Sequence, residues 1–168
     1  RELCSGPVAG LKMRHHGNLH LGKVLLVADD LLITGFEGNA SPPLEERRIK
    51  DSPLRDVATV LRSFDYARAT ALNRVGMGRP DLRDPLVPAL DEWLRQTTEF
   101  FLKGYRRAAV ESSCVPADDA SFAALTALFQ IECALHELRR ELEHRPSWIE
   151  VPIRALLTLV GPASAGHS

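Results

Sequence analysis

The hydrophobic pattern of the chain changes its period once, close to Asp51, and this change constrains the fold more than any other feature. Before it, two short apolar runs, VLLVA (24–28) and LLIT (31–34), flank the pair Asp29-Asp30. Apolar runs of this length around a polar turn predict a β-hairpin. After it, apolar residues recur three and four positions apart, as in amphipathic helices. The sequence therefore predicts an α+β fold, predominantly α-helical, with one short hairpin before a helical bundle.

Four helices are expected in the second part of the chain. The first begins with a Ser52 N-cap and Pro53 and ends at Gly76-Met77-Gly78. The second spans about 88–107, the third runs from a cap at 118 or 119 to the residue before 146, and the last spans about 152–160. The positions expected to face the core are Leu54, Val57, Leu61, Phe64, Leu90, Trp93, Leu94, Phe101, Tyr105, Phe122, Leu125, Phe129, Leu135, Leu138 and Leu142.

Charge and hydropathy argue against two classes of partner. The chain has 21 Lys and Arg against 22 Asp and Glu, so no net field attracts nucleic acid or an anionic membrane. Its apolar runs are far shorter than the roughly 20 residues of a membrane helix, and the first seven residues lack the apolar stretch of a signal peptide. We expect a cytoplasmic protein with no nucleic-acid partner and no membrane partner.

A polar loop, HHGNLHLGK (15–23), directly precedes the expected hairpin, and the turn Phe36-Glu37-Gly38 follows it. In the C-terminal lobe (C-lobe) of protein-kinase-like folds, a catalytic loop precedes a β-hairpin that ends in a metal-binding Asp, and helices support both. The chain resembles this layout. Residues 1–160 are thus expected to form a single C-lobe, with a catalytic-loop and hairpin region at 13–40 and a helical region at 52–160. Residues 161–168 are expected to be a flexible tail, and no N-terminal lobe is expected.

Longer blocks make the resemblance specific. They read HHGNLHLGKVL, LITGFEGNASPPLEERRIKDSPLRDVATVLRSFDYA, FLKGYR, and RPSWI followed by IRALL. These blocks resemble the maltokinase family, above all the kinase domain that is fused to trehalose synthase in bacteria, and the wider aminoglycoside-phosphotransferase-like fold. The resemblance implies ATP-dependent phosphorylation of maltose to maltose 1-phosphate, with ATP and Mg²⁺ as cofactors. It also implies a trehalose synthase domain as a partner.

Three positions depart from the family pattern, which reads HGD-x-HLGQVL and then DFEGEP. Asn18 stands at the catalytic Asp, Lys23 at a Gln that helps to hold a metal, and Gly35 at the principal Mg²⁺ ligand. An amide cannot accept the proton of a sugar hydroxyl, and losing a general base costs about 10² to 10⁴ in rate. Gly35 offers no side-chain oxygen, and the Lys23 ammonium either repels Mg²⁺ or contacts phosphate in its place. We therefore expect a phosphotransferase that is inactive or very weak, with ATP and Mg²⁺ binding weakened.

The retained polar residues leave alternatives open. Glu37 is retained as a weak metal ligand, or it is a carboxylate that is solvated or paired with a nearby Arg. Asp56 supports the loop by hydrogen bonds, or it is a solvated residue of a helix's first turn. His16 and His20 bind a metal together, or they anchor the backbone of the loop, which we favour.

Three aromatic residues and two charged runs are interpreted as structural. The large aromatic residues Trp93, Tyr105 and Trp148 stack on a sugar or, as we favour, belong to the core. The charged runs 45–48 and 137–141 are expected to be solvated helical faces.

Three functions follow from these observations. The first is an impaired maltokinase-like domain, serving as an interaction or sugar-binding module attached to trehalose synthase. The second is part of a fusion enzyme in which some phosphoryl transfer persists. The third is a helical scaffold without a ligand. The sequence leaves open whether the sugar is maltose or glucosamine.

Overall fold

The computed structural model describes residues 10–38, 43, 45 and 48–161. A short 3-10 helix, η1 (Leu21–Lys23), leads into a two-stranded antiparallel hairpin, and helices form the rest. The helices are α2 (Leu54–Gly78), α3 (Pro80–Ala108), α4 (Asp119–His144), η2 (Pro146–Trp148) and α5 (Glu150–Val160). The predicted α+β, mostly helical fold with one hairpin is confirmed. Of the tail expected at 161–168, residues 162–168 lie outside the described residues.

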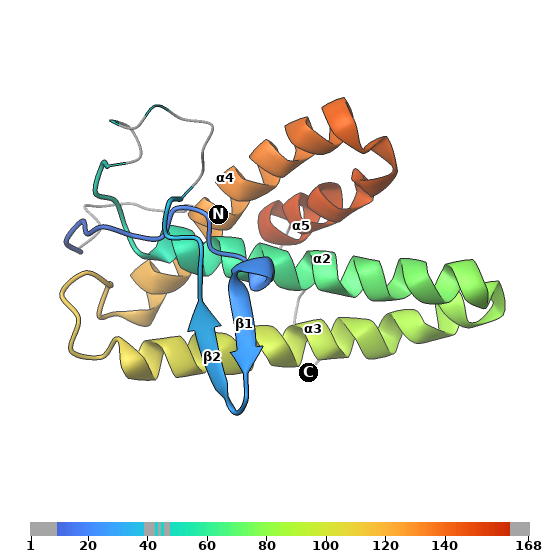
Figure 1. Ribbon diagram of the computed structural model, residues 1–168, viewed down its shortest axis with the longest axis horizontal. Helices are drawn as coiled ribbons and strands as arrows, with labels where there is room; N and C mark the ends of the chain where they lie inside the picture. The colour runs from blue at the N-terminus through green and yellow to red at the C-terminus, as the bar shows by residue number, and fades with distance from the viewer. Residues whose placement is uncertain (1–9, 39–42, 44, 46–47, 162–168) are drawn as a thin grey trace.

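The hairpin pairs β1 (Val24–Val27) with β2 (Asp30–Ile33), and Val24 lies opposite Ile33. Its turn is Ala28-Asp29, one residue earlier than predicted, because Asp30 already pairs with Val27. Ala28 has a φ of 53°, the left-handed backbone that tight two-residue turns require. The hairpin lies across α2 and α3 in the view of Figure 1, and its apolar side chains are largely exposed.

The core is built around α2, which lies between α3 on one side and the α4–α5 pair on the other (Figure 1). Its buried residues come from α2, α4 and the segment before α4. They are Leu54, Val57, Ala58, Val60, Leu61, Phe64, Val115, Phe122 and Phe129. The spacing of the first six along α2 is the helical period that the sequence predicted.

Helix α3 begins eight residues before its predicted start at 88. Pro80 occupies the first turn, where a missing N–H costs nothing, and the helix continues through Pro85 and Pro88. Proline usually ends a helix, but here α3 packs along the second half of α2, where Arg68 pairs with Asp91. Tertiary packing therefore outweighs the local signal.

The prediction of a core position is wrong for three residues, because their side chains are exposed. Trp93 is 40% exposed, Leu135 53% and Leu142 56%. On α4 the inward positions belong instead to Ala134 and Glu141, both fully buried. The second half of α4 therefore turns a partly polar face toward α2.

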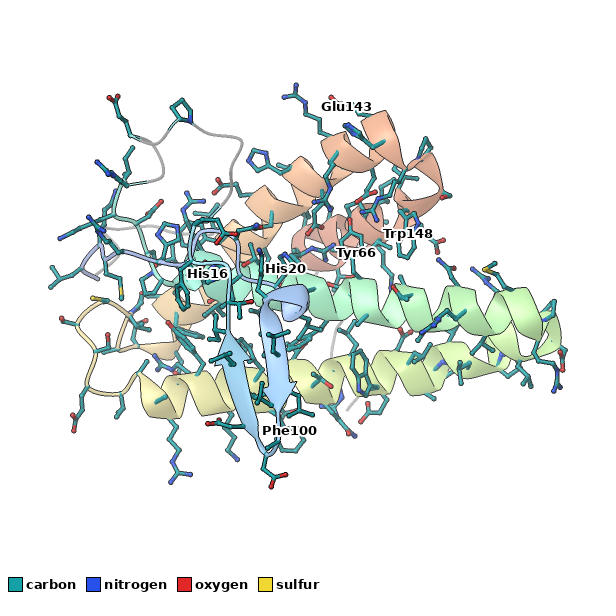
Figure 2. The ribbon with its side chains drawn as sticks, viewed as in Figure 1. His16, His20, Tyr66, Phe100, Glu143 and Trp148 are labelled. Atoms are coloured by element: carbon teal, nitrogen blue, oxygen red, sulfur yellow. The ribbon has the colours of Figure 1, made fainter. Side chains whose placement is uncertain are left out.

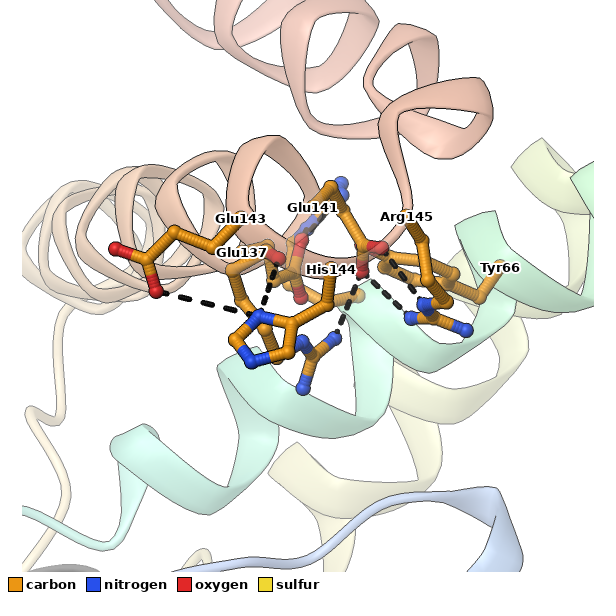
Figure 3. A network of polar contacts seen from close by, with 8 residues as sticks. Tyr66, Glu137, Glu141, Glu143, His144 and Arg145 are labelled. Atoms are coloured by element: carbon orange, nitrogen blue, oxygen red, sulfur yellow. Dashed lines mark hydrogen bonds and ion pairs between the residues drawn. The ribbon is translucent and has the colours of Figure 1, made fainter.

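This α2–α4 interface contains charged residues where solvated ones were predicted. Arg62, only 1% exposed, donates to Glu137 and to Asp65. The buried Glu141 accepts from the hydroxyl of Tyr66 (2.9 Å) and from Arg145 (2.6 and 2.8 Å), as Figure 3 shows. The expectation that 137–141 is a solvated face is therefore wrong for both of its glutamates.

Burial alone raises the pKa of a carboxyl, and in Glu137 it does so despite Arg62. In Glu141 the effect of burial is outweighed by hydrogen bonds from Arg145, Tyr66 and Arg140, which hold its pKa below the usual 4.5. The carboxylate of Glu141 is therefore stabilised in its ionised form by its neighbours.

No helix in the described part of the chain combines the length and apolarity needed to cross a bilayer.

Candidate functional site

The polar loop before the hairpin is held by one carboxylate. Asp56, in the first turn of α2, accepts the backbone N–H of His16 on Oδ2 (2.6 Å) and that of Gly17 on Oδ1 (2.9 Å). Gly17 has a φ of +76°, a conformation that glycine adopts without strain. Both oxygens of Asp56 are thus used to fix the loop against the start of α2.

His16 connects this loop to the end of the hairpin. Its Nδ1 accepts the backbone N–H of Asn18 (3.3 Å), so Nε2 carries the proton and donates to the carbonyl of Thr34 (2.9 Å). The buried ring also packs against Phe36, with centroids 5.1 Å apart. The loop, the end of β2 and the turn 36–38 therefore form one unit.

His20 has a local role at the other end of the loop. Its Nδ1 accepts the backbone N–H of Gly22 (3.1 Å) and caps η1. Burial lowers the pKa of His20, and the charge of Lys23 lowers it further. Figure 2 shows His16 and His20 near the same end of the hairpin, beside α2. In the described ranges, no three His, Cys, Asp or Glu side chains come together as a metal site.

Lys23 and Gly35 lie against each other at the end of the hairpin. The backbone N–H of Thr34 donates to the carbonyl of Lys23 (2.9 Å), which holds the two strands in register there. The Lys23 side chain covers Gly35 so closely that a Cβ on residue 35 would lie 2.5 Å from Nζ and 2.7 Å from Cδ. Nζ lies 3.4 Å from Oε1 of Glu37. A lysine ammonium therefore occupies the space that a side chain at position 35 would need.

These residues do not fit the Mg²⁺ ion that the maltokinase resemblance implies. Mg²⁺ requires oxygen ligands in near-octahedral geometry, and here Glu37 supplies a carboxylate while Gly35 supplies none. The backbone N–H of Glu37 and the Lys23 ammonium hold the pKa of Glu37 below its usual value. A fixed positive charge beside that carboxylate disfavours a divalent cation by repulsion.

Other predicted site residues lie elsewhere or have other neighbours. Asn18 is half-buried in the loop, between the two anchored histidines. Tyr105 packs against Phe122 beside the core. Trp148 stacks on Tyr66, with centroids 6.1 Å apart, away from the hairpin end (Figure 2).

Two supporting residues were missed in the sequence. Thr34 accepts from His16, and Ser63 Oγ accepts the backbone N–H of Leu21 (3.2 Å). Ser63 lies seven residues after Asp56, and this spacing places both on one face of α2. That spacing was the available signal, but the side chains of helical serines more often point to solvent or to their own backbone.

Comparison with known proteins identifies the fold. No protein-family model matches the chain. A glucosamine kinase of Streptacidiphilus jiangxiensis is 25% identical over 145 residues, which cover 86% of this chain and 31% of the relative. One of Mycolicibacterium smegmatis is 29% identical over 158 residues, which cover 92% of this chain and 36% of the relative. The chain thus spans about a third of the length of these relatives.

Solved structures agree with the sequence relatives. A glucosamine kinase in complex with glucosamine, ADP and inorganic phosphate matches 88% of the chain with a TM-score of 0.67 and 24% identity. Another crystal form of glucosamine kinase matches with a TM-score of 0.68 and 25% identity. These matches cover 32% of each of those chains. The fold is therefore that of the C-lobe of a kinase-like sugar kinase.

Proposed function

We propose that this chain is the C-lobe of a sugar-kinase-like protein that binds a sugar but is impaired in phosphoryl transfer. The observation that carries the proposal is the position of Lys23. The scaffold of the loop is intact, with both oxygens of Asp56 engaged, whereas a lysine ammonium covers the glycine that replaces the metal-binding Asp. On this proposal the support of a kinase loop is present, while a positive charge lies where a metal-binding carboxylate is expected.

Asn18 impairs the reaction in a second way. In a kinase the carboxylate at this position orients the sugar hydroxyl and accepts its proton as the phosphoryl group transfers. The amide of Asn18 can hydrogen-bond a hydroxyl but cannot accept its proton. Asn18 therefore supports binding and orientation of a sugar better than it supports transfer.

The sugar class is supported by the relatives, which are named glucosamine kinases, and one solved neighbour holds glucosamine. Glucosamine is the first candidate ligand. Maltose is the second, because the long blocks around LRSFDYA resemble maltokinases. A trehalose synthase partner rests on that resemblance alone.

Isothermal titration calorimetry of the 168-residue chain tests the sugar ligand. Glucosamine and maltose are compared at millimolar concentration, with the open-chain polyol sorbitol as a control. Heat that saturates with glucosamine supports the first candidate, and heat that saturates with maltose alone supports the second. Absence of heat with both cyclic sugars would contradict the proposal and leave a helical scaffold.

A further inference from the structure

The Lys23 ammonium is held in place by its surroundings. Its side chain is only 25% exposed, and its stem lies on the backbone of Gly35. Lys23 and Thr34 are joined through the Lys23 carbonyl, which accepts both the backbone N–H and the hydroxyl of Thr34. The backbone of Lys23 is thus held by the hairpin, and its ammonium lies over Gly35 at the hairpin end.

The Lys23 ammonium has N–H donors that no described residue accepts. A lysine ammonium carries three N–H donors, and among the described residues its Nζ meets one acceptor, Oε1 of Glu37. Their separation of 3.4 Å exceeds the 2.7–2.9 Å that is usual for a strong charge-assisted bond. The pair with Glu37 therefore does not use up the charge of Lys23.

Residues 15–23 of the loop carry no carboxylate of their own. The carboxylate of Asp56 is occupied by the N–H groups of His16 and Gly17. The spare donors of the Lys23 cation suit it to an anion, which would compete with Glu37 for the ammonium.

We infer that Lys23 is a tethered substitute for the divalent cation, and that this site binds the phosphate groups of a nucleotide or of pyrophosphate without a metal. The inference rests on the proposed kinase-like function of the site. Nζ donates to phosphate oxygens and neutralises part of their charge, while its own charge excludes Mg²⁺ from the same space.

A side chain at position 35 and the Lys23 side chain would compete for the same space. An aspartate at 35 requires the space that the Lys23 side chain fills, since its Cβ would lie 2.5 Å from Nζ. Gly35 also has a φ of +82°, which strains any residue with a Cβ. A carboxylate at 35 therefore requires the Lys23 side chain to move aside, and a metal site there calls for removal of the lysine charge as well.

Pyrophosphate binding, measured by calorimetry with EDTA and again with Mg²⁺, tests the inference on the unaltered chain. We expect equal affinity in the two buffers. Lys23→Gln should weaken binding about tenfold or more, because a charge-assisted contact is lost. Lys103→Gln, an exposed lysine on α3, is the matched control and should change nothing. Binding that requires Mg²⁺, an affinity unchanged in Lys23→Gln, or no binding at all would overturn the inference.

Metal binding gives a second readout that needs neither a nucleotide nor turnover. Water-proton relaxation with Mn²⁺ should detect no bound ion in the unaltered chain or in Gly35→Asp, and a bound ion in the double variant K23Q/G35D. Mn²⁺ binding by the unaltered chain, or none by the double variant, would contradict the tethered-cation role. Sugar calorimetry on the same samples reports the proposed function separately, so the two failures are distinguishable.

Discussion

Asp56 shows how much of the site depends on single side chains. It is the residue that joins the polar loop to α2, through two hydrogen bonds to consecutive backbone N–H groups. Consecutive N–H groups that point to one carboxylate fix the local backbone, and an ionised acceptor makes each bond stronger than a neutral one. The position of Asn18, one residue further along the loop, depends on this contact.

Replacing Asp56 by Ala should therefore loosen the loop without unfolding the helices. The loss of the two bonds should cost about 1.5 kcal/mol locally, or about tenfold in amide exchange, after allowance for solvent at a half-buried site. Hydrogen exchange at His16 and Gly17, followed by NMR, measures the effect. Asp84→Asn, at an exposed position on α3, should leave both amides unchanged. Unaltered protection of both amides in the Ala variant would show that Asp56 does not hold the loop.

The sequence predicts departures from the maltokinase pattern at Asn18, Lys23 and Gly35, but the contact between two of these residues could not be predicted. Lys23 and Gly35 are twelve residues apart, and they meet only because the hairpin register places Lys23 beside Thr34. The predicted turn was displaced by one residue, and a one-residue shift reverses which side chains share a face. The sequence thus indicates which residues are changed, while their joint effect depends on the register.

At the level of elements, the interface between α2 and α4 is the least expected feature of the fold. The apolar spacing of α2 was predicted, since its residues at three- and four-residue intervals are buried. The inward face of the second half of α4 was assigned to Leu135 and Leu142, which are exposed. Burial of Glu137 and Glu141 could not be foreseen, because it depends on Arg62 and Tyr66 across the interface.

Removing Arg62 should destabilise this interface strongly. Arg62→Met leaves Glu137 and Asp65 without their partner, and breaking one side of a buried pair typically costs about 3–5 kcal/mol. Adding Glu137→Gln should recover about 1–3 kcal/mol in a double-mutant cycle measured by urea unfolding. Arg139→Met, which removes an exposed pair with Glu143, should change stability by no more than about 0.5 kcal/mol. Purely additive effects of the first two changes would show that Arg62 and Glu137 are not coupled.

For the molecule as a whole, the carboxylates at the α2–α4 interface contribute to how stability responds to acid. Glu141 has a lower pKa in the folded protein than its usual 4.5, so the unfolded chain binds a proton first as the pH falls. Its stabilisation is therefore present above about pH 4.5 and is lost below it, as the pH falls through the folded pKa. Glu137 and Asp65 act in the opposite direction, because burial raises their pKa values.

Comparing Glu141→Gln with the unaltered chain isolates the contribution of Glu141. At about pH 7 the variant should be less stable by about 1–3 kcal/mol, and at about pH 3 this difference should shrink. Urea unfolding at the two pH values measures it, and Glu143→Gln, an exposed neighbour on α4, is the control. A difference that is the same at both pH values would contradict a lowered pKa at Glu141.

The fold of the whole chain followed from the order of loop, hairpin and helices, and comparison with glucosamine kinases agrees with it. The identity of the sugar ligand could not be predicted from this order of elements. The maltose assignment rests on sequence blocks such as LRSFDYA, in which Arg62 and Tyr66 contact α4 while Ser63 contacts the polar loop. The blocks therefore combine residues that pack the lobe with residues that hold the loop, and neither kind specifies the sugar.

The release of ADP from Mg-ATP in the presence of glucosamine is the most direct test of impaired transfer. It should be measured in the natural polypeptide that contains these 168 residues, beside the triple variant N18D/K23Q/G35D and heat-denatured controls. We expect no release above the control from the unaltered protein and measurable release from the triple variant, which has a carboxylate at both 18 and 35. Glucosamine-dependent turnover by the unaltered protein would contradict the loss of phosphoryl transfer.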